Sequence, residues 1–515
     1  MNFLLIDIGY DCEELNEPLG VEALSSFLKN KLPEIHIDSY CANCEGRDYF
    51  SIFNRYKPDI IGVSTHINTW KYFDDLYVEY LSFCEGSGTY PIILVGGILG
   101  TYEYEILINK YKNVICSIGE GEESLLQVLK LANSLDVLSY ANLLSSKEFV
   151  SCVNVAYKCH GKVVCNSRRC ISSFDNLSVL TEHKYLKAVL NKGGIARVEA
   201  SRGCPWNKCS FCVLRWKYAG EAWRPCSWDK VIPEIIDVAS QGAKAIYFTD
   251  EEFLAGSYHR LQVFIEKIKN LKSQEIIDKD LEFVASTSTQ ALLGKYSMSK
   301  TEVEKCLLSL KEIGFRSFFL GIESGSDKQL LRFRKGSTVK DNEDAILLLK
   351  KHSLEADIGY ILFDPLLSVS ELSESLEFLK RNGLENHISR FAKRLRLVPH
   401  TAYCNYPGIQ FEQYDHNAIE FTYKFKDPKV QKIFDCYSNW EVNHISLTHS
   451  VQAAIRATES SSEVRNDKIE RLSAIRQNEY EFLRYLVELA QTMPNFCEQP
   501  INTINTTVQL AEFKI

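Results

Sequence analysis

Three cysteines stand close together on one short stretch of the chain. Cys204, Cys209 and Cys212 form a C-x4-C-x2-C array directly after an apolar run at 195–200. Iron–sulfur clusters normally take four cysteine ligands. Three thiolates would therefore leave one iron of a [4Fe-4S] cluster open, as a catalytic zinc keeps one open position. An open iron can bind and activate a small molecule.

Two other sites are compatible with the same cysteines. A plant-type ferredoxin also uses C-x4-C-x2-C with a distant fourth cysteine, and Cys226 could be that ligand in a closed electron-transfer cluster. The same four thiols could instead hold a structural zinc ion. The segments that follow the array favour the open cluster over both.

Six short apolar runs, separated by amphipathic stretches, occupy the middle of the chain. They cover residues 195–200, 245–249, 281–286, 317–322, 357–363 and 394–398. Parallel βα repeats of this kind form a full or partial barrel, with chemistry at the C-terminal ends of the strands. We therefore expect a partial (β/α)6 barrel over 191–405. Polar residues stand directly after two of the runs, namely Asp250, Glu251, Glu252, Glu323 and Ser324.

The first 145 residues also alternate short apolar runs with amphipathic segments. The apolar runs cover residues 3–7, 60–64, 92–96 and 114–118. This alternation predicts an α/β domain with a doubly wound, Rossmann-like sheet, which binds ligands at the C-terminal ends of its strands. Gly96 and Gly97 stand where residues without a Cβ let the backbone approach a flat ligand or a neighbouring strand closely.

The remaining segments complete the expected domain organisation. A chain of 515 residues is expected to form two or three domains. Residues 146–190 combine short β-like runs with polar stretches and a helical bridge, which indicates a linker. Residues 406–515 form the C-terminal region, and the amphipathic, charged stretch at 466–493 predicts that it is mostly helical.

Composition excludes several classes of protein. The net charge of −8 argues against sequence-independent nucleic-acid binding, which needs a basic surface. No apolar run is long enough for a membrane span, and residues 1–8 are too short for a signal peptide. The 17 cysteines are spread along the chain, unlike those of a secreted disulfide scaffold. We expect a cytoplasmic protein with no nucleic-acid or membrane partner.

The cysteine array, with Phe211 just before its last cysteine, resembles the radical SAM superfamily. The family loop usually reads C-x3-C-x2-C, so the first spacer here is one residue longer. Four N-terminal segments resemble the cobalamin-binding-type domain that precedes the barrel in one large subgroup. These are residues 17–20, 58–64, 96–97 and 119–122. The resemblance covers roughly residues 1 to 400.

The resemblance implies a role for each candidate residue. The three cysteines would hold a [4Fe-4S] cluster whose open iron binds S-adenosylmethionine (SAM). Asp250, Glu251 and Glu252 would bind its amino group, because an ammonium calls for oxygen acceptors. The remaining expected contacts are the ribose or methionine portion for Glu323 and Ser324, and the adenine for Ile361 and Phe211.

For the N-terminal domain the resemblance leaves two outcomes open. The chain has no D-x-H-x-x-G motif, and Leu99 stands where many relatives have a histidine. A cobalt with a protein histidine ligand is thus unsupported. Cobalamin could bind at Gly96 and Gly97 without one, or the domain could be a structural remnant.

The resemblance predicts reductive cleavage of SAM by one electron from a donor such as flavodoxin or ferredoxin. The resulting 5′-deoxyadenosyl radical would abstract hydrogen from an unactivated carbon of a peptide or small natural product. With cobalamin bound, C-methylation is the expected outcome. Without it, the alternative is a peptide epimerase in which Cys404, after the sixth run, gives a hydrogen atom to the substrate radical. A closed-cluster electron-transfer protein is the non-enzyme alternative.

Overall fold

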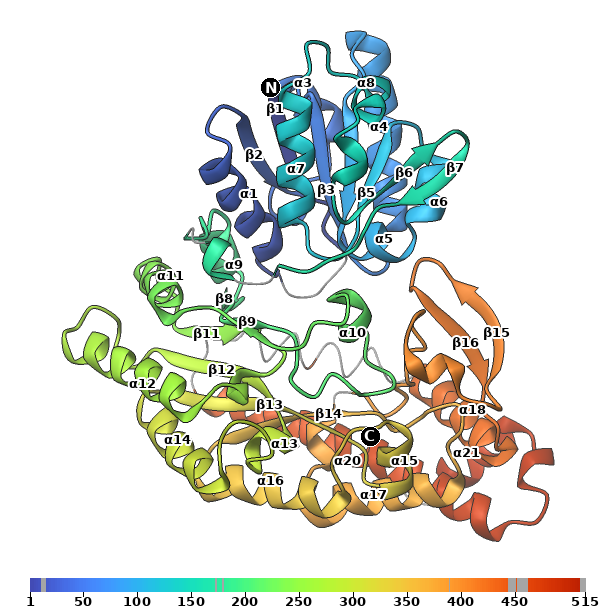
Figure 1. The fold of residues 1–515 in the computed structure, drawn as a ribbon. Coiled ribbons are helices and arrows are strands. Elements are labelled where there is room, and N and C mark those ends of the chain that lie inside the picture. The colour runs from blue at the N-terminus through green and yellow to red at the C-terminus, as the bar shows by residue number, and fades with distance from the viewer. Residues whose placement is uncertain are drawn as a thin grey trace.

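The computed structural model describes residues 1–10, 15–171, 174–177, 180–388, 390–442, 451 and 462–509. Two parallel sheets dominate it, one above the other in Figure 1, with the cysteine segment between them. Helices of the C-terminal region pack against the lower sheet domain. Among the described residues, every helix is too short or too polar to cross a bilayer.

The N-terminal sheet has seven strands in the order β2-β1-β3-β4-β5-β6-β7. The first five in this order are parallel, and the last two form an antiparallel hairpin. Their bounds are β1 Asn2–Asp7, β2 His36–Cys41, β3 Ile60–Thr65, β4 Ile92–Gly96, β5 Val114–Ser117, β6 Val155–Cys159 and β7 Lys162–Cys165. The hairpin therefore extends the first sheet, although its residues fall in the segment interpreted as a linker.

Helices cover both faces of this sheet because its strands are apolar on both sides. One apolar core contains residues of α1 and α7, and a second lies beneath α3, α4 and α6. The helices are α1 Leu19–Lys31, α2 Ala42–Glu45, α3 Tyr49–Tyr56, α4 Trp70–Ser87, α5 Gly97–Tyr102, α6 Tyr104–Lys110, α7 Glu122–Asn133 and α8 Tyr140–Ser145. This is the doubly wound arrangement that the sequence predicts.

The second sheet has five parallel strands in the order β14-β13-β12-β11-β8. Their bounds are β8 Ala196–Val198, β11 Ala245–Phe248, β12 Glu282–Ser288, β13 Phe315–Glu323 and β14 Glu355–Tyr360. The expected sixth strand is reduced to two isolated bridges, one between Phe363 and Arg394 and one between Leu397 and Phe421. The barrel is therefore partial and open on that side.

Helices cover the outer face of the second sheet (Figure 1). They are α11 Trp228–Ser240, α12 Tyr258–Ser273, α13 Thr289–Leu292, α14 Lys300–Glu312, α15 Asp327–Arg332, α16 Val339–Lys351 and α17 Val369–Asn382. Capping boxes begin three of them. In α14, for example, the hydroxyl of Ser299 caps the helix and Glu302 bonds back to the Ser299 backbone. Such reciprocal bonds satisfy the free N–H groups of the first turn.

The C-terminal region consists of a hairpin and helices. The hairpin pairs β15 Gln410–Asp415 with β16 Glu420–Lys424, and the helices are α18 Pro428–Val442, α20 Ser462–Thr492 and α21 Ile501–Gln509. Helix α20 packs on the barrel, where the Tyr480 hydroxyl donates to the Leu376 carbonyl at 3.1 Å. The hairpin instead reaches the N-terminal domain, where His416 pairs with Glu103 at 2.8 Å. This region thus bridges both sheets.

A buried cluster of charged residues joins α1 to the segment before the barrel. The His183 ring contacts Glu17 at 2.6 Å and Glu234 at 3.3 Å. Burial alone would lower the pKa of His183, but its bonds to these carboxylates raise it to about 10. Burial, reinforced by the charge of Glu17, raises the pKa of nearby Glu22 to about 8. Helix α9, Leu186–Asn191, follows this cluster.

Candidate functional site

The loop that carries the three cysteines runs from β9 Ser201–Arg202 to α10 Leu214–Lys217. Its centre is fixed to the segment after α15. The Ser210 backbone N–H donates to the Phe333 carbonyl at 2.8 Å, and the Tyr403 N–H donates to the Ser210 carbonyl at 2.7 Å. The ring of Phe211 meets that of Phe333 edge-on, with centroids 5.2 Å apart. The loop is therefore held by both backbone bonds and aromatic packing.

The long first spacer has its own anchor. The Trp206 indole N–H donates to the Arg334 carbonyl at 2.8 Å. Gly336, with φ +76, leaves room for this indole, because a Cβ there would lie 2.4 Å from the Trp206 ring. Asn207 adopts φ +44, and its amide donates to the Glu221 carbonyl at 3.1 Å. The spacer thus packs as an ordered bulge beside the cysteines.

The three thiols lie in a largely desolvated place. Burial raises the pKa of Cys209 to about 12 and of Cys212 to about 11, and it also raises the pKa of Cys204. These groups are therefore thiols until a metal supplies positive charge, since metal coordination deprotonates a cysteine. Three thiols on one fixed loop suit the ligand set of an iron–sulfur cluster with an open iron.

A buried lysine faces the same thiols. The ammonium of Lys335 pairs with Glu323 at 3.0 Å, and its charge also acts on Cys209. Burial alone would lower the pKa of Lys335, but these negative partners raise it. Glu323 has φ +67 at an irregularity in the β13–β14 register, which turns its carboxylate toward Lys335. Strained backbone of this kind tends to occur at functional sites.

The three carboxylates directly after β11 differ in their surroundings. Asp250 and Glu252 are buried, whereas Glu251 faces the N-terminal domain. The carboxylate of Asp250 accepts from the Ala200 N–H at 2.9 Å and from the Ser201 hydroxyl, so it braces the strand that enters the cysteine loop. Glu252 accepts from the Thr287 hydroxyl at 2.7 Å and the Ser288 N–H at 2.9 Å. Burial raises the pKa of both carboxyls to about 7.

Glu251 differs from its neighbours because it faces the N-terminal domain. Its carboxylate accepts from the Gly203 N–H at 2.7 Å, one residue before Cys204. The Tyr218 hydroxyl donates to it at 2.8 Å. Glu251 also lines a cavity between the two domains, so it links the cysteine loop to that cavity.

The expected contacts on β13 and β14 lie together. The Ile361 N–H donates to the Glu323 carbonyl at 2.8 Å, so these two residues occupy adjoining strand ends. Ser324 is fully buried and uses its hydroxyl locally, donating to Gln329 at 2.5 Å and accepting from the Ser326 N–H at 3.0 Å. The roles of these residues toward SAM stay predictions.

Two further cysteines lie apart from the array. Cys226 borders a separate cavity with Glu199 and Lys230. The Cys404 thiol contacts the Val398 carbonyl at 3.3 Å and the Thr401 hydroxyl at 3.3 Å. Its role as a hydrogen-atom donor stays a prediction.

A buried network of ion pairs joins the two domains. Arg202 and Arg224 both bond to Glu120 of the N-terminal domain, at 3.1 and 2.9 Å. Arg202 also pairs with Glu122 at 2.8 Å and Glu199 at 2.8 Å. Burial opposes ionisation of Glu120, but these arginines lower its pKa. The network fixes the distance between the two sheets.

A cavity of about 400 Å³ lies between the facing edges of the sheets. Its inner part is apolar and lies between strands and helices of the N-terminal domain, lined by Leu5, Leu24, Leu94 and Leu125. Its outer part is bounded by the barrel residues Glu199, Arg202, Lys217, Tyr218, Thr249 and Glu251. Neither histidine nor cysteine is among the described residues that line it.

The glycine pair lies on the N-terminal side of this cavity. A Cβ on Gly96 would have open space, with its nearest neighbour 3.9 Å away. Gly97, with φ +73, instead packs against backbone, because a Cβ there would lie 2.2 Å from the Thr65 carbonyl oxygen. Gly97 lets β3 and β4 approach, whereas Gly96 leaves room for a ligand. Leu99 is fully buried in the domain core.

Comparisons with known proteins agree with this architecture. The model of the radical SAM superfamily matches residues 198–379. A 4′-phospho-dehydrooxetanocin synthase of Priestia megaterium is 26% identical over 341 residues, which are 63% of this chain and 43% of that protein. An uncharacterized methyltransferase of Pyrococcus horikoshii is 26% identical over 405 residues, covering 77% and 78%. The middle of this chain, residues 198–379, is thus a radical SAM domain.

Solved structures share the whole arrangement. OxsB, a cobalamin-dependent SAM radical enzyme with aqua-cobalamin and SAM bound, superposes with a TM-score of 0.81 at 18% identity, over 99% of this chain and 75% of OxsB. The methyltransferase TsrM of Kitasatospora setae superposes with a TM-score of 0.61 at 14% identity, over 81% of each chain. These likenesses confirm the fold predicted from the sequence, including the Rossmann-like N-terminal domain.

Proposed function

We propose that this protein is a cobalamin-dependent radical SAM enzyme. The proposal rests on the cavity of about 400 Å³ between the two domains. Glycines at the edge of the N-terminal sheet line one side of it, and barrel residues that hold the cysteine loop line the other. A ligand in this cavity contacts both domains. The names of OxsB and TsrM, which share the fold, report cobalamin in those proteins.

The lining of the cavity fits cobalamin in two ways. The apolar inner slot suits an aromatic base, and the open space at Gly96 suits a flat macrocycle lying against the strand ends. Neither histidine nor cysteine is among the described lining residues, so those residues would hold cobalamin without giving it an imidazole or thiolate ligand. The fit therefore depends on shape and backbone approach.

The barrel residues would hold the other two cofactors. Cys204, Cys209 and Cys212 would ligate the [4Fe-4S] cluster, and SAM would lie over the strand ends that carry Glu252 and Glu323. The cofactors supply the one-electron chemistry. The chain would orient SAM, keep water out through its buried walls, and hold the ammonium of Lys335 beside the thiolates of the loop.

The proposed reaction is C-methylation, or another radical step at an unactivated carbon, of a peptide or small natural product. Two relatives support this class by name, one a methyltransferase and one a synthase. No contact of the described residues favours the epimerase reading, since the Cys404 thiol is engaged with Val398 and Thr401. Substrate and reductant are part of the proposal.

Anaerobic reconstitution tests the proposal. We expect the purified protein, given iron, sulfide and hydroxocobalamin, to retain about one cobalamin and four irons per chain after desalting, with both chromophores in its absorption spectrum. It should then form 5′-deoxyadenosine or S-adenosylhomocysteine from SAM under a strong reductant. A protein that carries the cluster but releases all cobalamin would refute the cobalamin-dependent reading.

A further inference from the structure

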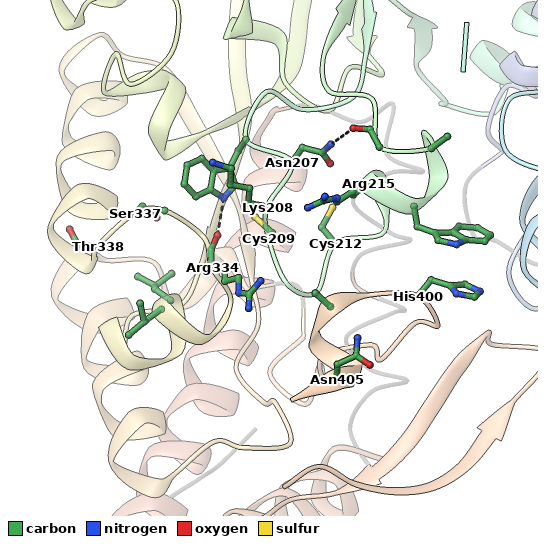
Figure 2. Close-up of a pocket in the computed structure, with 18 of the residues that line it drawn as sticks. Asn207, Lys208, Cys209, Cys212, Arg215, Arg334, Ser337, Thr338, His400 and Asn405 are labelled. Carbon is green, nitrogen blue, oxygen red and sulfur yellow. Dashed lines mark hydrogen bonds between the residues drawn. The ribbon is translucent and has the colours of Figure 1, made fainter. Parts of the chain in front are cut away.

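A large groove reaches the cysteine loop from outside the barrel. Its volume is about 1140 Å³, and Arg168 and three longer stretches of the chain line it. These are the cysteine loop with α10, the segment around α15, and residues 400–405. Figure 2 shows Cys209 and Cys212 at its inner wall.

The groove is distinct from the expected SAM site. Glu252, Glu323 and Ile361, at the strand ends inside the barrel, are not among its described lining residues. The groove is lined instead by Trp206, Asn207 and Lys208 on the long first spacer. The groove therefore reaches the cysteine loop along the long first spacer and the segment around α15, rather than along the strand ends where SAM is expected to lie. A molecule bound in the groove would contact the cysteine loop rather than the strand ends where SAM is expected to lie.

The charge of the groove contrasts with that of the whole protein. The chain has a net charge of −8. Yet four cationic side chains line the groove, those of Arg168, Lys208, Arg215 and Arg334. Figure 2 shows Lys208 beside Cys209 and Arg215 beside Cys212, with Arg334 across from them. The described acidic lining residue, Asp327, accepts from the Val339 N–H at 2.7 Å.

An apolar surface accompanies these charges. Leu331 is 80% exposed at the groove, and Trp206 and Ala402 add apolar area. An exposed apolar patch rimmed by charge is typical of a protein-docking surface. A small substrate would not need an exposed leucine beside a cationic rim.

We infer that this groove docks the acidic electron-carrier protein that reduces the cluster. The inference rests on the proposed function, because it requires a cluster on Cys204, Cys209 and Cys212. Complementary charge would steer the carrier to the groove and orient it. The carrier would lose one electron and the cluster would gain it, and no bond forms or breaks. The ligands Cys209 and Cys212 place that cluster directly behind the groove wall.

Reduction of the reconstituted enzyme by two donors tests the inference. Flavodoxin in its reduced form is the acidic protein probe, and photoreduced deazaflavin is a small uncharged donor that needs no docking. The variant is Arg215→Glu with Arg334→Glu, whose side chains point into the groove from two segments. We expect its second-order rate of cluster bleaching by flavodoxin to fall about 100-fold at low salt. Its rate with deazaflavin should match that of the parent.

A charge-matched control separates docking from net charge. Lys130→Glu with Lys305→Glu changes two exposed residues that line none of the described cavities. The control should keep the parental flavodoxin rate. Leu331→Ser should slow flavodoxin by about tenfold without changing the effect of salt, because it removes apolar contact only.

Several results would overturn the inference. These are equal losses in the control and the groove variant, an unchanged flavodoxin rate in the groove variant, or a parental rate that does not fall as salt rises. A parent that deazaflavin reduces and flavodoxin does not would also overturn it. Absence of a reducible cluster with either donor would instead refute the proposed function.

Discussion

The facing edges of the two sheets differ in chemistry although both are ends of parallel strands. The N-terminal edge is lined mostly by glycines and apolar side chains, with Gly96 open toward the cavity, and its carboxylates Glu120 and Glu122 pair with arginines. The barrel edge carries cysteines, carboxylates and the buried Lys335. A glycine edge holds a ligand by shape, whereas a charged edge holds a metal cluster and a charged small molecule. Two edges of the same parallel topology would thus serve two kinds of cofactor.

The comparison predicts, first, that the two edges lose their cofactors independently. Replacing Cys204, Cys209 or Cys212 with Ala leaves only two cysteine ligands, which should not retain the cluster. Each variant should therefore lose its iron, and SAM cleavage should fall by more than about 1000-fold. Cobalamin retention should be unchanged. Iron, cobalt and 5′-deoxyadenosine measured on one sample check all three.

Cys226→Ala is the matched control for this loss. Cys226 borders another cavity, so its variant should keep both iron and SAM cleavage. If Cys226→Ala loses iron as completely as the other three, a closed cluster with four protein ligands is correct.

The second prediction concerns the glycine edge. Gly96→Leu should fill the cavity and weaken cobalamin binding by about 100-fold, since a flat ligand cannot share that space. Gly96→Ala should change it far less, because its Cβ has no neighbour closer than 3.9 Å. Equilibrium titration with hydroxocobalamin distinguishes them. Equal affinities in parent and Gly96→Leu would place the ligand elsewhere.

The third prediction concerns the carboxylates of the barrel edge. A charge-assisted bond to an ammonium contributes about 1.5 to 3 kcal/mol. Replacing Glu252 with Gln should therefore weaken SAM binding roughly tenfold or more, with iron content unchanged. Exposed Glu266 on α12 provides a control substitution. Unchanged SAM affinity in Glu252→Gln and in Asp250→Asn would mean that the ammonium binds at another place.

The fourth and smallest effect concerns the junction between the two regions. The folded-state pKa of His183 is about 10 against an ordinary 6.5, and that of Glu22 is about 8 against 4.5. Between each pair of values the folded state holds a proton that the unfolded state has released. Stability therefore falls as pH rises through these windows.

Thermal unfolding of the apoprotein measures this effect. We expect the midpoint of the transition to fall by about 2 to 4 °C between pH 6.5 and 9.5. The variant His183→Gln should show a smaller dependence in the upper part of that range. A midpoint that rises with pH would contradict the protonated state assigned to the junction.

Much of the site could be predicted because its signals are local. The spacing of the cysteines and the polar residues directly after apolar runs need only the chain order and the rule that strand ends share an edge. Those residues lie together in the structure, as Ile361 and Glu323 show with their 2.8 Å backbone bond. The doubly wound N-terminal domain could be predicted for the same reason, because its signal is a pattern along the chain.

The rest depends on neighbours distant in the chain. Lys335 follows no motif, and only its burial against Glu323 and Cys209 reveals it. The pairing of Arg202 with Glu120 joins residues of different domains. The β6–β7 hairpin had the right local pattern, but its place on the edge of β5 is set by long-range pairing. The strand expected at 394–398 keeps only two isolated bridges, at Arg394 and Leu397, because the open side of the barrel offers it little to pair with.

An anaerobic crystal structure with hydroxocobalamin and SAM would test the central claim most directly. Anomalous scattering recorded at the iron and cobalt edges locates each metal separately. The account predicts an iron peak at Cys204, Cys209 and Cys212, and a cobalt peak in the cavity between Gly96 and the pair Tyr218 and Glu251. Full iron occupancy without cobalt in that cavity would contradict it.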